Sequence, residues 1–229
     1  MIPKIIHYCW FGHGEMNKKA QKCIESWKKY CPDYQIIEWN EENVDVYQND
    51  YTTYLYNEKK YAFLSDYVRL QKVYEYGGLY FDVDVEAVRS FDDLLKEPAF
   101  FGFETNEYVN TGMGFGAEKG NKAVYEMLRE YDTYLDGRHG YKGCPKLNTA
   151  ALIRMGLKCD GSMQRKEDYV VFPAEYFNPY DDPTGTLSIT ENTYSIHWYA
   201  KSWMPKSKRM RSVLTKPLHK IMKSRKKER

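Results

Sequence analysis

The sequence predicts an α/β protein in which strands alternate with helices along most of the chain. Ile2 to Trp10 is a compact apolar run that predicts a buried first strand, and it ends at a glycine-containing turn. Apolar residues at helical spacing follow from Asn17 to Tyr30, and a second strand pattern follows from Tyr34 to Trp39. With 229 residues, 42% of them hydrophobic, the chain is long enough for one sizeable core. In a doubly wound sheet, ligands bind outside the carboxyl ends of the strands.

The same periodicities predict the later elements in turn. The polar segment 40–57 predicts a connection with a short helix, and the proline-rich loop 173–185 is long enough to shape an acceptor site. Gly112, Gly114 and Gly116 recur at every second residue, which indicates either close approach of the backbone to a ligand or a strand packed under an aromatic side chain. Helices are expected over 61–76, 121–135 and from Cys144 onward, and short strands over 99–104, 112–117, 169–172 and 188–197.

The helix expected over 61–76 carries a carboxylate on its apolar side. Asp66 falls inside the apolar stripe when the segment is laid out at about 100° per residue. A buried carboxylate is disfavoured unless a cation, hydrogen-bond donors or a ligand compensates its charge. We therefore expect Asp66 to be paired or to take part in function, and Arg69 lies one turn away. The apolar stripe consists of Ala62, Phe63, Tyr67, Leu70, Val73 and Tyr74.

An acidic strand is expected directly after this helix. Two glycines, 77 and 78, can supply the left-handed residue that ends the helix, and the segment 79–86 then alternates strictly. Three acids on one face repel one another, which suggests that a cation belongs there. Asp82 and Asp84 would lie about 7 Å apart on an extended strand, so both bind one ion only if the strand bends. The alternative is an edge strand whose solvent face is acidic. The polar face consists of Tyr80, Asp82, Asp84 and Glu86.

These residues resemble the signature of glycosyltransferase family 32. The resemblance rests on SDYVR at 65–69 and on GGLYFDVD at 77–84, which contains a DXD motif. IPKIIHYCWFG near the N-terminus and SIHWYAKSW at 195–203 are similar to further family motifs, so the resemblance spans residues 2 to 203. Bacterial members of the family are mostly capsule or surface-polysaccharide enzymes. The resemblance implies a GT-A-like nucleotide-sugar-binding fold, with a mixed, mostly parallel central sheet, and a hexosyltransferase activity.

The resemblance also implies a metal site and a catalytic set. His197 is implied as the third metal ligand beside Asp82 and Asp84, with Mn²⁺ as the expected ion and Mg²⁺ as the alternative. A neutral imidazole suits a borderline cation such as Mn²⁺, although a single histidine can equally be a packed core residue. The implied catalytic residues are Asp84, Asp82, Asp66 and Arg69, of which the last two would hold the hydroxyl groups of the donor sugar.

Further residues are expected to contact the substrates. Trp10 follows the first strand and is implied to stack on the uracil of the donor; its alternative role is that of a core tryptophan. Asn148 and Thr149 correspond to an element that lines the donor-sugar and acceptor pocket in the family, although helix capping explains the same residue types. The other expected substrate-binding residues are Ser65, Asp66, Arg69, Tyr80, Asp82, Lys201, Ser202 and Trp203. Of these, the resemblance implies that Ser202 and Trp203 lie over the diphosphate and that Lys201 contacts a phosphate.

The expected reaction is transfer of a hexose or N-acetylhexosamine from a UDP-sugar to a glycan or a lipid-linked oligosaccharide. Members of family 32 retain the anomeric configuration, and no carboxylate in the sequence is an evident nucleophile. We therefore expect attack on the same face of the sugar, with the leaving phosphate taking the proton of the acceptor. A GDP-linked mannose donor remains an alternative. Two alternative functions are a glycoside hydrolase with paired carboxylates and a non-enzymatic module that binds carbohydrate or lipid.

The charge of the chain is divided between an acidic body and a basic end. Twelve Lys or Arg residues and one acid lie between Lys201 and Arg229, a net charge of +11, so the first 200 residues carry −9. We expect a catalytic domain over 1–203 and a basic amphipathic tail over 204–229. The tail predicts peripheral binding to anionic lipid on the inner face of the plasma membrane. A solvated, disordered terminus and a nucleic-acid patch are the alternatives, but no nucleic-acid motif accompanies the patch.

The cysteines and the hydropathy of the chain predict a cytoplasmic location. The five cysteines are odd in number and show no spacing typical of metal ligands. The N-terminus carries no apolar run typical of a signal peptide, because Pro3, Lys4 and His7 interrupt it. No stretch of about 18 apolar residues is present. We therefore expect reduced thiols in a cytosolic protein.

Overall fold

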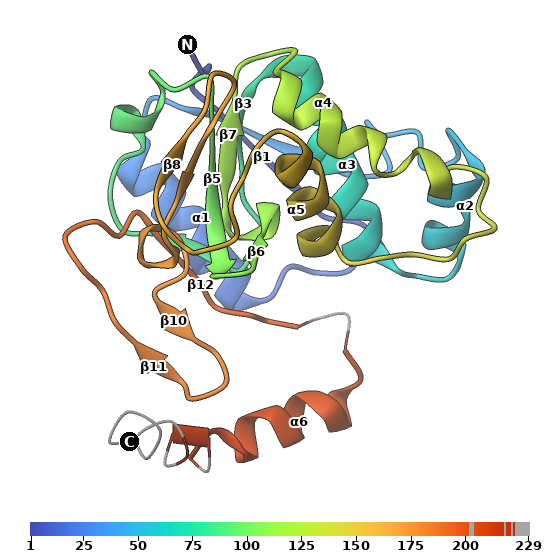
Figure 1. Ribbon diagram of the computed structural model, residues 1–229. Coiled ribbons are helices and arrows are strands. Elements are labelled where there is room, and N and C mark those ends of the chain that lie inside the picture. The colour runs from blue at the N-terminus through green and yellow to red at the C-terminus, as the bar shows by residue number, and fades with distance from the viewer. Residues whose placement is uncertain (202–203, 218, 221, 223–229) are drawn as a thin grey trace.

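A computed structural model describes residues 1–201, 204–217, 219, 220 and 222 of the chain (Figure 1). At its centre is a sheet of eight strands that is covered by helices. The strands of this sheet are β1 (Ile5–Cys9), β2 (Gln35–Trp39), β3 (Gly78–Tyr80), β5 (Ala99–Thr105), β6 (Tyr108–Val109), β7 (Phe115–Ala117), β8 (Gln164–Arg165) and β9 (Val170–Phe172).

The strand directions confirm the predicted mixed, mostly parallel sheet. The strand order is β2-β1-β3-β7-β5-β9-β8, with β6 beside β5. β1 pairs in parallel with β2 and β3, and β5 pairs in parallel with β9. β7 is antiparallel to both β3 and β5, so β5 runs in the same direction as β3. Five strands therefore share one direction, while β6, β7 and β8 run against it.

Hydrophobic clusters cover both faces of the sheet. On one face, helices α2 to α5 pack over Phe101 and Phe103, and on the other, α1 and a small two-stranded sheet pack over Phe100. The opposite directions of Phe100 and Phe101 follow from the two-residue period of a strand. The helices are α1 (Lys18–Tyr30), α2 (Asp50–Asn57), α3 (Tyr61–Tyr76), α4 (Lys122–Arg129), α5 (Cys144–Arg154) and α6 (Lys206–Leu214). The remaining strands are β4 (Val85–Ala87), β10 (Tyr180–Asp181), β11 (Thr186–Leu187) and β12 (Ser195–His197).

Local sequence signals account for where the helices begin and end. Asn17 precedes α1, and its side chain accepts hydrogen bonds from the backbone N–H groups of residues 19 and 20. The predicted helix over 61–76 is confirmed as α3, and Gly77 ends it in the left-handed region with a φ of 70°. The predicted helix over 121–135 is shorter than expected, because α4 ends at Arg129 and a 3₁₀ turn over 132–134 follows. The strand expected over 188–197 is shorter than predicted and consists of β12 alone.

The expected continuous strand over 79–86 is wrong. β3 ends at Tyr80 and β4 begins at Val85, and the backbone N–H of Val85 donates to the carbonyl of Asp82 across a turn at 3.0 Å. Asp82 and Asp84 therefore do not lie two residues apart on one pleated face. Glu86 lies elsewhere, since its carboxylate accepts the indole N–H of Trp198 at 2.8 Å.

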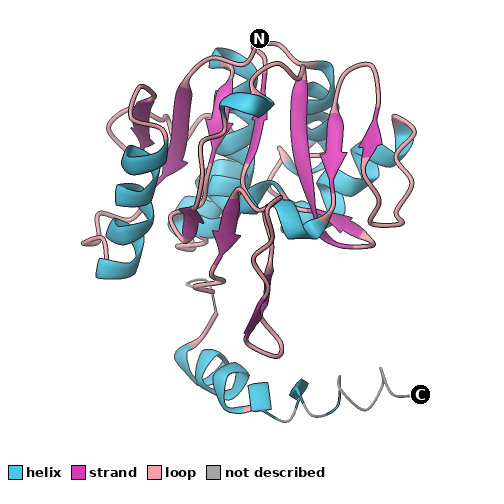
Figure 2. Ribbon diagram, turned by 90° about the vertical axis from the view of Figure 1, so that its left-hand side faces the viewer, coloured by secondary structure: helices cyan, strands magenta, loops and turns pink. Residues whose placement is uncertain are grey.

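The hairpin β10–β11 and helix α6 lie together at one end of the body, on the side away from the N-terminus (Figure 2). Among the described residues, no helix has the length and apolar character needed to cross a bilayer.

Candidate active site

A cleft of about 1510 Å³ opens beside the carboxyl ends of β1 and β3. Trp10 and Phe11, which follow β1, line it, as do Asp82 and Asp84, which follow β3. This is the position expected for ligands of an open α/β sheet. The indole of Trp10 is half-buried, and its N–H donates to the carbonyl of Gly14 at 2.7 Å, which fixes the ring at the cleft wall.

Two carboxylates and one imidazole meet at the floor of this cleft. One ligand atom each of Asp82, Asp84 and His197 lies within 4.8 Å of the others. The turn at 82–85 makes this possible, together with the antiparallel pairing of β12 with β4, in which His197 lies opposite Val85. The turn between β3 and β4 is the bend that binding of one ion by both aspartates was expected to need. It brings the three metal residues predicted from the sequence together.

The donor set fits a divalent cation. Carboxylate oxygens and an imidazole suit Mn²⁺ or Mg²⁺. The Nε2 of His197 faces Asp84, and the buried Nδ1 has no hydrogen-bond partner among the described residues. Arg69 pairs with Asp66 and Asp82, whereas Asp84 faces His197. While His197 is neutral, one guanidinium therefore stands against three carboxylates, and two negative charges stay uncompensated. A doubly charged cation would balance them.

The segment after β12 wraps around Asp84 and orients it. The backbone N–H of Ala200 donates to Asp84 Oδ2 at 2.6 Å, and that of Trp198 donates to the Asp84 carbonyl at 2.9 Å. One carboxylate oxygen is thereby held, while Oδ1 faces His197 Nε2 at 3.4 Å. Burial opposes ionisation of both groups, but their mutual attraction outweighs it, so the pKa of Asp84 is lowered and that of His197 is raised.

The ring of Tyr199 packs against the ring of His197. The two ring centroids are 4.1 Å apart. The Tyr199 hydroxyl donates to Glu104 at 3.0 Å and accepts from Asn178 at 2.8 Å, so side chains from two other segments fix the tyrosine. Tyr199 has a φ of 50°, an unfavourable value for a bulky residue that the surrounding contacts must hold.

A buried arginine joins Asp66 to Asp82. Arg69 is 2% exposed, and its Nη2 lies 2.5 Å from Asp66 Oδ1 and 3.3 Å from Asp82 Oδ1. Its Nε donates to the carbonyl of Ser65 at 3.1 Å, and its plane lies over the ring of Tyr80 at 4.8 Å. Asp66, which was expected to be paired or to take part in function, is thus paired with Arg69. Arg69 Nη1 is buried beside Gly112 and has no hydrogen-bond partner among the described residues.

The buried position of Asp66 makes the stability of the protein depend on pH. Burial raises the pKa of Asp66 to about 6, although the nearby Arg69 acts to lower it. Because this pKa lies above that of an exposed aspartate, the folded state binds the proton more tightly than the unfolded state. We expect this contribution to be fully present below about pH 4 and to be lost as the pH rises through about 6, by on the order of 2 to 3 kcal/mol.

Urea unfolding at several pH values, compared between wild type and Asp66→Asn, measures this dependence. The difference in unfolding free energy between the two proteins should change between pH 4 and 6 and stay constant above pH 7. A difference that does not vary with pH would show that Asp66 ionises as an exposed aspartate does.

Gly112 leaves no room for a side chain beside this cluster. A Cβ at this position would lie 2.5 Å from Asp82 Oδ2 and 2.9 Å from Arg69 Nη1. The Gly112 carbonyl also accepts the backbone N–H of Asp82 at 3.3 Å. The packing interpretation of the glycine repeat holds at Gly114 and Gly116, where a Cβ would meet a phenylalanine ring, whereas Gly112 lies against Asp82 and Arg69.

We expect Gly112→Ala to displace the Asp82 carboxylate and to cost about 1 to 3 kcal/mol of stability, as overpacking does. Gly14→Ala is the matched control, because a Cβ there meets nothing within 4 Å. Thermal unfolding and Mn²⁺ titration of both variants test this expectation. Equal melting temperatures and equal Mn²⁺ affinities would show that the space around Asp82 is not limiting.

Several expected substrate-binding residues do not line the cleft. Asn148 is fully buried, and its amide donates to Thr111 at 2.8 Å, while the Thr149 hydroxyl accepts the backbone N–H of Val109 at 2.9 Å. Both side chains thus fasten α5 to the neighbouring loop and strand instead of facing a sugar. Tyr80 is buried as well, and its hydroxyl donates to Asp82 Oδ1 at 3.0 Å, so it contacts the site through Asp82.

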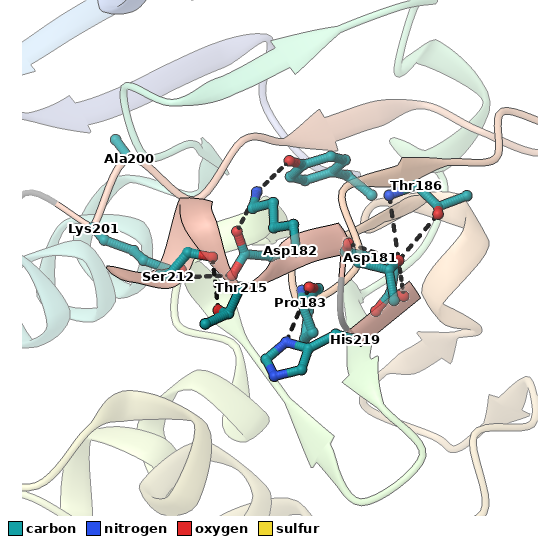
Figure 3. Close-up of polar contacts among 12 residues, drawn as sticks. Asp181, Asp182, Pro183, Thr186, Ala200, Lys201, Ser212, Thr215 and His219 are labelled. Atoms are coloured by element: carbon teal, nitrogen blue, oxygen red, sulfur yellow. Dashed lines mark hydrogen bonds and ion pairs between the residues drawn. The ribbon is translucent and has the colours of Figure 1, made fainter. Parts of the chain in front are cut away.

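Two further expected residues, Ser65 and Lys201, line the cleft. Ser65 lines the cleft, and its hydroxyl donates to the carbonyl of Tyr61 at 2.9 Å. Lys201 also lines it, but its ammonium group is paired with Asp182 and donates to Ser212 at 2.8 Å, so it does not face the interior as a free phosphate contact (Figure 3). Ser202 and Trp203 lie outside the described residues.

Sequence analysis did not identify Glu104, Asn178 or Tyr199. The segment SIHWYAKSW contains Tyr199, but nothing in the sequence links this tyrosine to Glu104 at a strand end or to Asn178 in a loop. The loop 173–185, which was expected to shape an acceptor site, does line the cleft with residues 179–183.

Comparison with known proteins agrees with this arrangement. Residues 17–101 match the family described as "Glycosyltransferase sugar-binding region containing DXD motif", a stretch that holds Asp66, Arg69, Asp82 and Asp84. Among solved structures, the PaToxG glycosyltransferase aligns with a TM-score of 0.54 and 21% identity over 68% of this chain and 70% of its own. A glycosyltransferase involved in glycosylation of the major capsid of PBCV-1 aligns with a TM-score of 0.52 and 13% identity over 93% of this chain and all of its own.

The fold is that of a GT-A glycosyltransferase. The likeness to these structures shows the fold alone, and it confirms the predicted fold class.

Two curated relatives are also glycosyltransferases. Inositol phosphoceramide mannosyltransferase 3 of Schizosaccharomyces pombe is 31% identical over 150 residues, which are 60% of this chain and 39% of the relative. Mannosyl phosphorylinositol ceramide synthase CSH1 of Saccharomyces cerevisiae is 35% identical over 107 residues, 44% of this chain and 27% of the relative. The chain thus spans about two fifths or less of the length of these relatives. The expected enzyme class agrees with the class of the relatives and of the structural neighbours.

Proposed function

We propose that the protein is a metal-dependent, retaining glycosyltransferase that moves a hexose or N-acetylhexosamine from a UDP-sugar to a glycan or lipid-linked acceptor. The observation that carries this proposal is the meeting of Asp82, Asp84 and His197 within 4.8 Å, at the floor of a cleft that also contains a buried Asp66–Arg69 pair. A cation site next to a fixed charge pair suits a sugar attached to a diphosphate.

Each group of residues has a distinct task in this proposal. Asp82, Asp84 and His197 would hold a divalent cation, which when bound stabilises the charge of the departing diphosphate. Trp10 at the cleft wall presents its ring to the base of the nucleotide. Arg69, which lines the cleft, keeps the Asp66 carboxylate ionised, and Asp66 accepts from a sugar hydroxyl.

We propose attack by the acceptor on the face of the sugar from which the phosphate departs. The resemblance to a retaining family supports this stereochemistry. The bond between the anomeric carbon and the phosphate oxygen breaks, the acceptor oxygen bonds to that carbon, and its proton passes to the departing phosphate. The side chains of Asp66 and Arg69 hold the sugar in place during this exchange.

The names of the curated relatives widen the choice of donor and acceptor. Because they are mannosyltransferases of an inositol phosphoceramide lipid, the mannose donor and a lipid acceptor both gain support. Surface-polysaccharide synthesis stays a prediction from the family resemblance. The proposed setting is the inner face of the plasma membrane, where anionic lipid meets the basic end of the chain.

A thermal-shift panel of nucleotide sugars with Mn²⁺ tests the donor. UDP-galactose, UDP-glucose, UDP-N-acetylgalactosamine and GDP-mannose should be compared with UDP, GDP and ATP. We expect one nucleotide sugar to raise the melting temperature, and a ligand at a hundred times its Kd adds about 2.7 kcal/mol of stability. A panel without any shift, in a protein that binds Mn²⁺, would contradict the donor proposal.

Dependence on metal separates this function from its rivals. A glycoside hydrolase with paired carboxylates needs neither a nucleotide nor a cation, so it would stay active after treatment with EDTA. A binding module would turn over no donor at all. We expect turnover of the donor to stop in EDTA and to return when Mn²⁺ is added. Full activity in EDTA would favour the hydrolase.

A further inference from the structure

Helix α6 exposes an apolar face that no described residue covers. Met210, Val213 and Leu214 are 64%, 61% and 75% exposed. Their spacing of three and four residues places them side by side on one face of the helix. The exposed bases Lys208 and Arg211 lie on the same helix. Apolar side chains that gather at this exposure, with cations beside them, mark an interaction surface.

The charges of this surface favour an anionic bilayer as its partner. The segment from Lys201 to Arg229 carries a net charge of +11, whereas the rest of the chain carries −9. An amphipathic helix with bases around an apolar face binds in the plane of the lipid headgroups. Each base near an anionic surface contributes about 1 kcal/mol, and the acidic body is repelled from it. Nucleic acid would attract the bases but would leave the apolar face exposed.

A cluster of ion pairs joins this segment to the hairpin β10–β11. Asp182, which is 13% exposed, is paired with Lys201 through one carboxylate oxygen and with Lys216 through the other, the latter at 3.2 Å (Figure 3). Lys216 also donates to the hydroxyl of Tyr180 at 2.6 Å. The contacts of Asp182 therefore link the residues on both sides of α6 to the hairpin.

Further contacts strengthen this junction. His219 Nδ1 lies 3.3 Å from the carbonyl of Pro183, and Lys201 donates to Ser212 at 2.8 Å. Two cations around one largely buried carboxylate form a stronger unit than an isolated surface pair, because solvent screens them less. The hairpin and the basic segment should therefore move together.

The hairpin is also part of the cleft wall. Residues 179–183 and Lys201 line the cleft that contains Asp82 and Asp84. We infer that α6 docks on an anionic membrane and that Asp182 holds the β10–β11 hairpin to that docked segment, so that the mouth of the cleft faces the lipid surface. The idea that an acceptor enters by this route rests on the proposed function. The membrane junction itself does not depend on that function. An acceptor carried by a lipid would then enter beside the hairpin.

Sedimentation with lipid vesicles tests the docking surface. Full-length protein should bind phosphatidylcholine vesicles that contain phosphatidylglycerol, should not bind vesicles of phosphatidylcholine alone, and should dissociate as salt rises. Arg211→Ser should weaken binding about fivefold, because one base near an anionic surface contributes about 1 kcal/mol to the binding free energy. Leu214→Ser should weaken it as well, whereas Leu187→Ser, which replaces a less exposed leucine of the hairpin, should change it less. Equal binding to both kinds of vesicle, or none, would overturn the docking surface.

Hydrogen exchange with and without anionic vesicles tests the junction. In the wild type, vesicles should slow exchange in α6 and in residues 180–187. Asp182→Asn should still bind vesicles and protect α6, but it should lose the added protection of the hairpin. Lys216→Gln removes a partner of the same carboxylate and should also lose the added protection of the hairpin. It replaces Asp182→Asn in the experiment if that variant does not fold.

Asp93→Asn is the matched control for the loss of charge, because Asp93 is exposed and pairs only weakly with Arg89 at 3.4 Å. A hairpin that is protected equally in the wild type and in both junction variants would overturn the role of Asp182. These measurements use neither donor nor acceptor, so their failure is distinct from a failure of the proposed activity.

Discussion

Asp84→Asn is expected to abolish sugar transfer while the protein stays folded. The amide oxygen of an asparagine can still accept the backbone N–H of Ala200, which preserves the wrap of the segment after β12. The change removes one of two excess negative charges beside His197. The remaining single charge no longer balances a doubly charged cation. Because a metal ion contributes several kcal/mol to the stabilisation of transition-state charge, we expect transfer to fall at least about a thousandfold.

Initial rates with saturating Mn²⁺, together with Mn²⁺ titration by calorimetry, measure this effect. Asp93→Asn makes the same chemical change on the surface and should keep the wild-type rate. Melting temperatures of the two variants within a few degrees of wild type would show that the fold survives. An Asp84→Asn protein that retains both Mn²⁺ affinity and activity would contradict the assignment of Asp84 as a ligand.

Arg69→Ala is expected to cause the largest loss of stability. Arg69 is the guanidinium that compensates Asp66 and Asp82, and removing it leaves the buried Asp66 and the half-buried Asp82 without a cation. Breaking a buried ion pair from one side costs about 3 to 5 kcal/mol. For a domain of this size such a loss is a large fraction of the total stability.

Urea unfolding at pH 7 gives the size of this effect. The midpoint should fall strongly in Arg69→Ala and should recover in part when Asp66→Asn is added, because one of the uncompensated charges is then gone. Arg129→Ala is the control, since Arg129 is exposed and its ion pairs are 3.9 Å long, and it should change stability by less than about 1 kcal/mol. A midpoint of Arg69→Ala equal to that of the control would show that Arg69 does not compensate the buried acids.

Periodicity was sufficient to predict the elements that position the site. The apolar run of β1 and the helical spacing of α3 are local patterns, and each gave the element within a few residues. The expectation that Asp66 is paired also followed from a local conflict, since a carboxylate lay inside an apolar stripe. These features could be predicted because neighbouring residues determine them.

The turn between Asp82 and Asp84 could not be predicted in the same way. Strict alternation over 79–86 favours a continuous strand, but two distant contacts end it: the carbonyl of Gly112 accepts the backbone N–H of Asp82, and β12 pairs with β4. Alternation alone carries no information on which residues far along the chain will pair. The metal site therefore forms through a tertiary contact that overrides the local strand pattern.

The same limit explains the misplaced residues around the cleft. Asn148 and Thr149 are polar residues near the start of a helix. The same pattern is found in residues that cap a helix, residues that bind a substrate and residues that hydrogen-bond to a neighbouring element. In the structure their partners are Thr111 and the backbone of Val109, which lie about 40 residues away in sequence. Lys201 was expected at a phosphate because of its motif, but an aspartate in the hairpin takes its charge.

The most direct measurement is the position of Mn²⁺ in crystals grown with Mn²⁺ and UDP, located by anomalous scattering. We expect one strong peak bonded to the carboxylates of Asp82 and Asp84, or to one of them and His197, with both phosphates of UDP as the remaining ligands. A peak elsewhere in the cleft, or UDP bound with no peak beside these three residues, would contradict the account.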